Sequence, residues 1–322
     1  LRILKQDKFG TLGAGFEFTL YADYKCTEPV SVFSTDSTGI AISDWLPEGR
    51  YFLKETKLPE GSLHVLGTMS YSIDIHTGET YEITFSNLLQ AGKIGVLKAD
   101  DAGTPMTGIV FGVYSDPECT KMAAMPFRTD ENGVALCELE PGNYYVKELT
   151  KNPQYILDTT VYPVTVTAKT TTYINQGEPV INTRKSKIEL IKKDPDGILG
   201  AGYVFGIYTD EACAELVQTI TTNETGTAVS DWLIPDNTYY VKEISLPEDD
   251  TIHAVSEEIF PIEVLPGETG QVTVINEFLP GQITVLKTSQ EGQKLSGAKF
   301  LLEWSEDGMT WAPVTYTDSE NV

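Results

Sequence analysis

Three polar residue types recur together along this chain of 322 residues: a lysine, then a glutamate, then an asparagine. The glutamate follows the lysine by 50 or 51 positions, and the asparagine follows the glutamate by 32 to 34. The three sets are Lys5, Glu55 and Asn87; Lys98, Glu148 and Asn182; and Lys192, Glu243 and Asn276. Side chains two apart in a strand share a face, and this parity places all nine residues among apolar neighbours. Because a lone buried ammonium is costly, each lysine requires a partner or a chemical fate.

The chemistry open to such a trio is the formation of an amide crosslink. Burial lowers the pKa of a lysine, and the neutral amine is a nucleophile. It can attack the side-chain carbonyl of the asparagine while the glutamic acid polarises that carbonyl and carries protons. Ammonia then leaves. The alternative is a buried ion pair hydrogen-bonded to an amide, but such pairs are weak sources of stability and do not explain three copies.

The lysines also mark an internal repeat that must position these residues. One short strand pattern ends at a lysine in four places, residues 3–5, 94–98, 188–192 and 283–287, with periods of 93, 94 and 95. We therefore predict domains near 1–89, 90–184 and 185–279, arranged end to end, and a partial fourth at 280–322. The fourth contains Lys287 without a matching glutamate or asparagine, so no bond is expected there.

Alternating apolar and polar residues, with turn signals every ten or so positions, predict an all-β sandwich in each repeat. The first and last strands of a repeat should be neighbours, so that lysine and asparagine meet. A glycine stands 10 positions after each lysine, which predicts a positive φ or a close approach of backbones there. These glycines are Gly15, Gly108, Gly202 and Gly297.

At the lysine, the Tyr-x-x-Lys-Glu segment and the asparagine, the chain resembles tandem CnaB-type domains. These are the immunoglobulin-like, prealbumin-like domains of SpaA-type pilins and of collagen-binding adhesin stalks in Gram-positive bacteria. The resemblance covers essentially the whole chain. It implies a catalytic role for the glutamates and isopeptide bonds between lysines and asparagines. By motif, the catalytic residues are Glu55, Glu148 and Glu243, and the bonded pairs are Lys5 with Asn87, Lys98 with Asn182 and Lys192 with Asn276.

One departure from the family pattern leaves the second asparagine open. Inserted residues in the second repeat bring in Asn175 as a competitor of Asn182. Asn182 lies 10 positions before the next lysine, and Asn87 and Asn276 each lie 11 before theirs. This spacing favours Asn182.

Composition excludes several classes of function. The net charge of −24, from 23 basic and 47 acidic residues, argues against nucleic acid or an anionic membrane as a partner. No run approaches the ~20 apolar residues of a membrane span. No signal peptide is visible, and we expect the chain to be an excerpt whose export and anchoring signals lie outside it. The histidines and cysteines lack metal-ligand spacing, so we expect no metal and no cofactor.

Cysteines and tryptophans are interpreted as packing residues. Cys26, Cys119 and Cys213 occupy equivalent positions and are expected to be small buried apolar residues. Cys137 lies close enough in sequence to pair with Cys119, a bridge that we disfavour but leave open. Trp45 and Trp232 stand in matching segments and could stack on a sugar, although packing beside a turn is the favoured interpretation.

Two hypotheses of function follow. The first is a structural rod, the stalk of an adhesin or the shaft of a pilus, on the wall of a Gram-positive bacterium. Its partners would be neighbouring domains of the same chain and, for the full-length protein, a sortase. The alternative is a binding module that contacts a host matrix protein or glycan. An enzyme that turns over an external substrate has almost no support.

Overall fold

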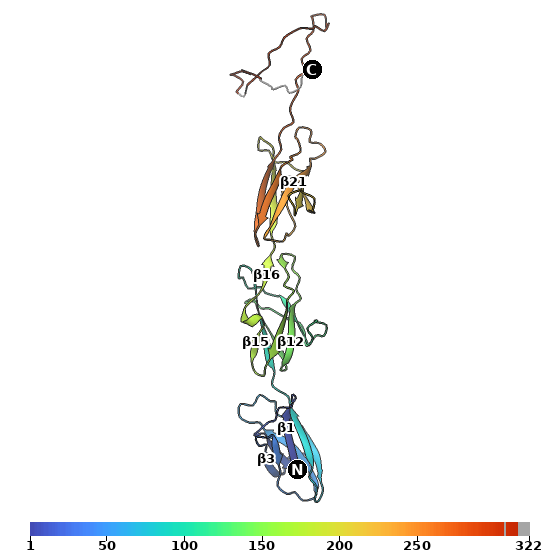
Figure 1. The fold of residues 1–322 in the computed structure, drawn as a ribbon, viewed down its shortest axis with the longest axis vertical. Helices are drawn as coiled ribbons and strands as arrows, with labels where there is room; N and C mark the ends of the chain where they lie inside the picture. The colour runs from blue at the N-terminus through green and yellow to red at the C-terminus, as the bar shows by residue number, and fades with distance from the viewer. Residues whose placement is uncertain (306, 315–322) are drawn as a thin grey trace.

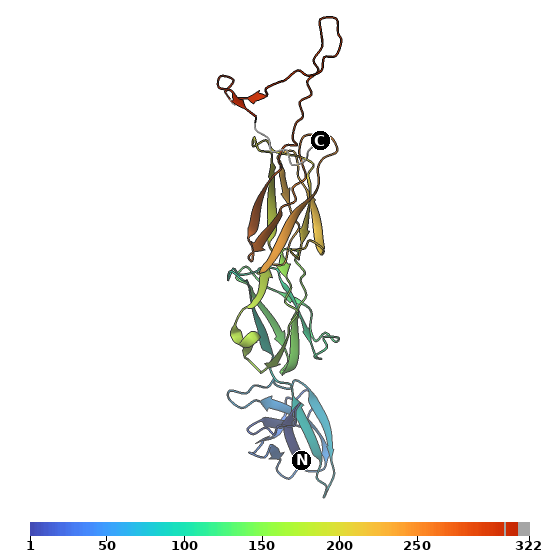
Figure 2. The same ribbon diagram turned by 45° about the horizontal axis from the view of Figure 1, so that its top comes forward.

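The computed structural model describes residues 1–305 and 307–314 and is built almost entirely of β-strands. Its helical content within these residues is one 3-10 turn, η1 (Asn175–Gly177). Three compact bodies follow one another along a single axis, with the N-terminus at one end (Figures 1 and 2). The predicted all-β fold and rod-like arrangement are confirmed.

The first unit is a sandwich of two sheets, ordered β4-β1-β7 and β3-β2-β5-β6. Its strands are β1 (Arg2–Asp7), β2 (Glu17–Tyr21), β3 (Pro29–Ser34), β4 (Ile40–Ile42), β5 (Gly49–Lys57), β6 (Ser70–Ile75) and β7 (Glu82–Asn87). Alternate residues of β1 and β5 are buried, as expected for strands with one face against a core.

The second unit repeats this architecture with sheets ordered β10-β9-β12-β14 and β11-β8-β16-β13, and β15 pairs with β8. Its strands are β8 (Gly92–Asp100), β9 (Val110–Tyr114), β10 (Phe127–Arg128), β11 (Val134–Leu139), β12 (Gly142–Glu148), β13 (Tyr155–Ile156), β14 (Val161–Val166), β15 (Thr171–Tyr173) and β16 (Val180–Arg184). The added turn η1 lies between β15 and β16, where the inserted residues stand in the sequence.

The third unit has sheets ordered β20-β17-β23 and β19-β18-β21-β22. Its strands are β17 (Lys187–Lys193), β18 (Val204–Tyr208), β19 (Leu216–Thr221), β20 (Thr227–Val229), β21 (Asn237–Ser245), β22 (Ile259–Val264) and β23 (Thr269–Ile275). Each unit has a separate hydrophobic core. A fully buried phenylalanine, 13 positions after the lysine, occupies the same place in each: Phe18, Phe111 and Phe205.

The first and last strands of every unit are neighbours, as the crosslinking hypothesis required, and the structure adds that they run parallel. β1 pairs with β7, β8 with β16 and β17 with β23. The glycines 10 positions after each lysine all have a positive φ, between 76° and 82°. Glycine adopts this conformation without steric cost, so the turn after the lysine strand is built in the same way in each repeat.

After the third unit the chain has little regular structure. In the described part of residues 280–322 the strands are β24 (Glu303–Trp304) and β25 (Ala312–Pro313), and almost every side chain is exposed. Residue 306 and residues 315–322, which belong to the predicted fourth repeat, lie outside the described residues.

The structure corrects two predictions about packing. Cys26, Cys119 and Cys213 are half-buried and stand at positive φ of 53° to 55°, because each closes a tight loop rather than facing the core. Cys119 and Cys137 are not bonded.

The tryptophans also differ from the prediction. We expected Trp45 to pack beside its turn, but its side chain is 97% exposed. Its counterpart Trp232 is 37% exposed.

Candidate functional site

Each predicted trio comes from the same three places in its unit. The lysine lies on the first strand, the glutamate on the long central strand of the facing sheet, and the asparagine on or directly after the last strand. Nine polar or ionisable side chains are thus buried in the cores of the three units. The lysines, glutamates and asparagines are all between 0% and 5% exposed: Lys5, Lys98, Lys192, Glu55, Glu148, Glu243, Asn87, Asn182 and Asn276.

The parallel register explains why lysine and asparagine meet. In the second unit Lys98 lies opposite Val180, and Asn182 is two residues further along the neighbouring strand. Opposite residues and their second neighbours share a face, so the two side chains point into the same core. Two residues of a strand span about 7 Å, a distance that an extended lysine side chain covers. The first and third units have the same register.

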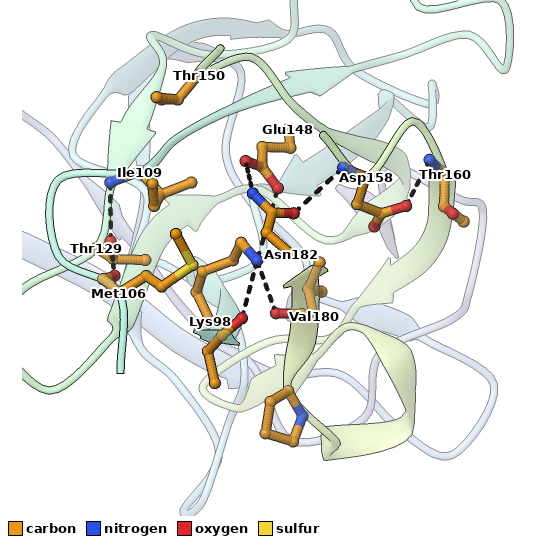
Figure 3. A network of polar contacts seen from close by, with 12 residues as sticks. Lys98, Met106, Ile109, Thr129, Glu148, Thr150, Asp158, Thr160, Val180 and Asn182 are labelled. Atoms are coloured by element: carbon orange, nitrogen blue, oxygen red, sulfur yellow. Dashed lines mark hydrogen bonds and ion pairs between the residues drawn. The ribbon is translucent and has the colours of Figure 1, made fainter. Parts of the chain in front are cut away.

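The second unit shows the contacts of the trio in detail (Figure 3). Asn182 Nδ2 donates a hydrogen bond of 2.7 Å to Glu148 Oε1. The Lys98 ammonium nitrogen Nζ lies 3.8 Å from Glu148 Oε2 and donates to the main-chain oxygens of Val180 at 2.9 Å and Ala99 at 3.2 Å. The glutamate therefore contacts both residues that the proposed bond would join.

The first and third units hold the asparagine in the same way. Asn87 Nδ2 donates to Glu55 Oε2 at 2.6 Å, and Asn276 Nδ2 donates to Glu243 Oε2 at 2.8 Å. In both, the lysine nitrogen lies over an aromatic ring. These pairs are Lys5 Nζ with Phe16, 4.3 Å from the ring centroid, and Lys192 Nζ with Tyr203, 4.2 Å from it.

Asn175, the alternative in the second unit, lies apart from this cluster. It belongs to η1, is half-buried, and its Nδ2 donates to the main-chain oxygens of Glu178 and Pro179. Asn182, in contrast, is 2% exposed and bonded to Glu148. The geometry thus brings Asn182, and not Asn175, to the glutamate.

Comparison with known proteins identifies the repeats. Residues 1–88, 92–178 and 186–277 each match the model of the SpaA prealbumin-like fold domain. The chain belongs to this family. No curated protein matches. The three units are called the first, second and third SpaA domains below.

The chain is similar to several solved structures, including the following three. The Bacillus anthracis TIE protein is 25% identical, with a TM-score of 0.40 over 86% of this chain and 50% of its own. The chain thus spans about half the length of that protein. BcpA, the major pilin subunit of Bacillus cereus, is 14% identical, with a TM-score of 0.42 over 86% of this chain and 98% of its own. A streptococcal ancillary pilin is 15% identical, with a TM-score of 0.35 over 87% and 98%.

Burial shifts the pKa of the three lysines and of two of the glutamates. Desolvation lowers the pKa of Lys5, Lys98 and Lys192, and the charge of the neighbouring glutamate offsets this only in part. Desolvation also raises the pKa of Glu148 and Glu243. Both shifts favour the neutral forms, because a low-dielectric interior penalises isolated charges. A neutral amine beside a neutral acid is the state in which the amine can act as a nucleophile.

In every SpaA domain one oxygen of the glutamate has no hydrogen-bond partner among the described residues. These buried atoms are Glu55 Oε1, Glu148 Oε2 and Glu243 Oε1. An unpaired buried acceptor costs free energy, and a protonated carboxyl group would carry its hydrogen on one of its two oxygens. The free oxygen is therefore a position at which a proton can be taken up and released.

The contacts of the glutamate differ in one respect from the expectation. We expected it to face the asparagine carbonyl, but in all three domains the carboxyl group contacts the amide nitrogen. The reason is complementarity, since a carboxylate only accepts hydrogen bonds and the amide nitrogen donates them. That nitrogen is the atom that would leave as ammonia, so the carboxyl group is placed to protonate the leaving group.

Main-chain N–H groups, which the residue pattern did not predict, complete each site. Gly67 N donates to Glu55 Oε2 at 2.9 Å and Ser256 N donates to Glu243 Oε2 at 2.6 Å. In the second domain Asp158 N donates instead to Asn182 Oδ1 at 3.2 Å. No residue type marks a backbone donor, so the sequence carried no signal for these groups.

Residues 1–305 and 307–314 contain no cluster of three or more histidine, cysteine, aspartate or glutamate side chains suited to a metal ion. Those residues also include no helix of the length and hydropathy needed to cross a membrane.

Proposed function

We propose that this chain is a structural segment of a bacterial surface shaft or stalk, and that each SpaA domain is locked by an intramolecular Lys–Asn isopeptide bond. The observation that carries the proposal is the burial of a lysine, a glutamate and an asparagine together in each core, with the glutamate hydrogen-bonded to the asparagine. Three buried ion pairs would add little stability, whereas three covalent bonds would add much.

The reaction is an exchange of one amide for another. The lone pair of Lys98 Nζ attacks Cγ of Asn182, and the carbonyl π electrons move onto Oδ1. When that oxyanion collapses, the Cγ–Nδ2 bond breaks and the nitrogen leaves as ammonia. Glu148, starting as the neutral acid, gives its proton to the departing nitrogen and takes back the proton that the lysine nitrogen loses, so the carboxyl group is unchanged at the end. The fold holds the reactants together, which replaces a bimolecular encounter.

The arrangement of domains supports a load-bearing role. Between the first and second domains, Lys8 Nζ contacts Glu140 Oε2 at 2.7 Å, and Lys169 Nζ donates to the main-chain oxygen of Ser62 at 2.8 Å. Within each domain the proposed bond joins the first strand to the last. A pulling force on the chain would therefore pass through the crosslink without separating these strands.

The domain limits and cellular context belong to the same proposal. We place the domains at residues 1–89, 90–184 and 185–279, with a partial fourth repeat at 280–322. The full-length protein would be exported, joined to the cell wall by a sortase and displayed outside a Gram-positive cell. The domain family supports this context.

Intact mass is the decisive measurement. The folded protein is expected to weigh less than its sequence by three molecules of ammonia, and digestion should release branched peptides that join Lys5 to Asn87, Lys98 to Asn182 and Lys192 to Asn276. The matched control replaces all three catalytic glutamates by glutamine and should regain the full mass expected from its sequence. A folded wild-type protein with the uncrosslinked mass would refute the locking proposal.

A second candidate function is adhesion through the first domain, and the exposure of Trp45 favours it. This side chain is 97% exposed and borders a groove of about 780 Å³, which is also lined by Arg2, Asp44, His76 and Glu79. An exposed indole with polar neighbours can stack on a sugar ring. Binding to a glycan array or to matrix proteins, lost in Trp45→Ala and kept in Trp232→Ala, would support adhesion. Absence of binding by the wild type would exclude the ligands tested.

A further inference from the structure

The second SpaA domain differs from the other two in where its loop N–H group points. Asp158 N donates to Oδ1 of Asn182, the oxygen of the carbonyl that the lysine would attack (Figure 3). In the first and third domains the corresponding loop donates to the glutamate instead, through Gly67 N and Ser256 N. Asn276 Oδ1 is buried and has no hydrogen-bond partner among the described residues.

The contacts of Asn182 fix the direction of its amide group from both ends. Its nitrogen faces the carboxyl group of Glu148 at 2.7 Å, and its oxygen faces the N–H of Asp158 at 3.2 Å. A flipped amide would set acceptor against acceptor at Glu148 and donor against donor at Asp158. The carbonyl oxygen is therefore held at a hydrogen-bond donor before the reaction begins.

This donor matters because negative charge develops on Oδ1 during the attack. A fixed N–H aimed at that oxygen stabilises the oxyanion in a site from which water is excluded, and removing one such donor typically slows a reaction by 10²- to 10³-fold. Hydrogen bonds that are somewhat long before reaction tighten in the transition state. The contact at 3.2 Å is in that range.

Deepening the proposed function, on which this inference rests, we propose that the main-chain N–H of Asp158 is the oxyanion donor for bond formation in the second domain. Asp158 is then a catalytic residue through its backbone, and the second domain locks faster than the other two. The bonds made and broken are those given above: Nζ–Cγ forms, the carbonyl pair rests on Oδ1 against the Asp158 N–H, and Cγ–Nδ2 breaks to release ammonia.

The side chain of Asp158 holds this N–H in place. Its carboxylate accepts hydrogen bonds from Thr160 N at 3.0 Å and from the Tyr162 hydroxyl at 2.7 Å. Burial acts to raise the pKa of Asp158, but these donors outweigh it and the pKa is lowered, while burial and the carboxylate raise the pKa of Tyr162 to about 12. The tyrosine stays protonated and anchors the loop, so it acts as a positioning residue for the donor.

The position of the loop N–H also affects the pKa of the glutamate. In the third domain the Ser256 N–H opposes the rise in the pKa of Glu243, because it stabilises the charged carboxylate. Among the described residues, the hydrogen bond that opposes the rise for Glu148 is that of Asn182 alone. The second domain thus places its loop donor on the oxyanion and leaves its acid free to protonate the leaving group.

The experiment measures the rate of bond formation in all three domains of one molecule. The full chain is pulse-labelled during cell-free synthesis, samples are quenched in acid over time, and the three branched peptides are quantified by mass spectrometry. In the wild type the peptide that joins Lys98 to Asn182 should appear at least tenfold faster than the other two. Equal rates, or a slower second domain, would overturn the inference while leaving the proposed function intact. Absence of every branched peptide would refute both.

The decisive variant removes only the N–H. An α-hydroxy analogue of aspartate at position 158 replaces the amide by an ester and keeps the side chain. It should slow the second bond about 10²-fold and leave the first and third bonds unchanged. The same replacement at Ser256 is the control and should leave the second bond unchanged. An unaltered second rate in the Asp158 ester would overturn the inference.

If the ester variant fails to fold, Tyr162→Phe decides, because it releases the loop anchor and keeps the backbone. It is expected to slow the second bond several-fold without changing the melting temperature of the domain once it is locked. An unchanged rate in Tyr162→Phe would count against the inference.

Discussion

Replacing Glu148 by glutamine tests the locking of the second domain in energetic terms. Glutamine has nearly the same shape and keeps an oxygen that can accept the hydrogen bond from Asn182, but it cannot carry the proton that the reaction needs. The second bond should therefore be lost while the first and third form. Relative to its own sequence, Glu148→Gln should lack two ammonia molecules, where the wild type lacks three.

The size of the stability change follows from the loop that the bond closes. Lys98 and Asn182 are 84 positions apart, so the crosslink encloses almost the whole domain. The chain-entropy relation for disulfides gives about 4.5 kcal/mol for a loop of this length. For a domain of this size 1 kcal/mol corresponds to about 4–8 °C. The second domain of the variant should melt roughly 20–35 °C below that of the wild type.

Differential scanning calorimetry of the wild type, Glu148→Gln and a matched surface variant measures this difference. Glu138→Gln makes the same chemical change on the exposed face of β11 in the same domain and should alter the melting temperature by no more than a few degrees. If Glu148→Gln lacks the second bond but its second domain melts within about 5 °C of the wild type, the stabilisation expected from loop closure is wrong, and the crosslink serves another purpose.

Three further predictions follow from the structure. In Glu148→Gln, Lys98 should stay free with a lowered pKa, so below the usual lysine pKa the unfolded chain binds more protons than the folded one. The stability of the second domain should therefore rise as pH is raised from neutral towards about 10. Denaturant titrations should show no such rise in the wild type, in which the proposed bond would consume the lysine. Limited trypsin digestion should cut first at Lys287, Lys294 or Lys299, because nearly every described side chain after residue 280 is exposed and an extended chain can enter the active site of a protease. First cuts within the three domains would contradict this prediction. Replacing Lys8 and Lys169 by alanine removes two contacts between the first and second domains and should shorten the maximum dimension measured by small-angle scattering. Domain stability should stay unchanged to within about 1 kcal/mol, because exposed ion pairs are weak. An unchanged scattering profile would show that the linker itself sets the angle between the two domains.

Sequence parity was sufficient to predict that the polar side chains of the three trios are buried. Lys98 and Glu148 are each 2% exposed, as their alternation with apolar residues indicated. Alternation is a local property of an extended strand, so it can be counted without knowing the partner strand. The repeat period likewise predicted three similar sandwiches and the positive φ of Gly108 and its equivalents.

The sequence was less informative wherever the answer depended on loops. The expectation that Trp45 packs beside its turn was wrong, and so was the expectation that Cys119 and its equivalents are core residues. Both predictions rested on residue type. Exposure in a loop depends on how the backbone turns and on what lies next to it, which residue type does not specify.

The sequence by itself determined the fold class, the repeat and the burial of the nine trio residues, because strand alternation and a period of about 94 positions can be read along the chain. Only the tertiary structure decided which asparagine of the second domain meets Glu148, that the carboxyl group faces the amide nitrogen, and that the N–H of Asp158 faces the carbonyl oxygen. These contacts join residues 24 and 34 positions apart. They depend on the register of parallel strands and on the direction of a loop backbone, and a main-chain N–H is the same in every residue except proline.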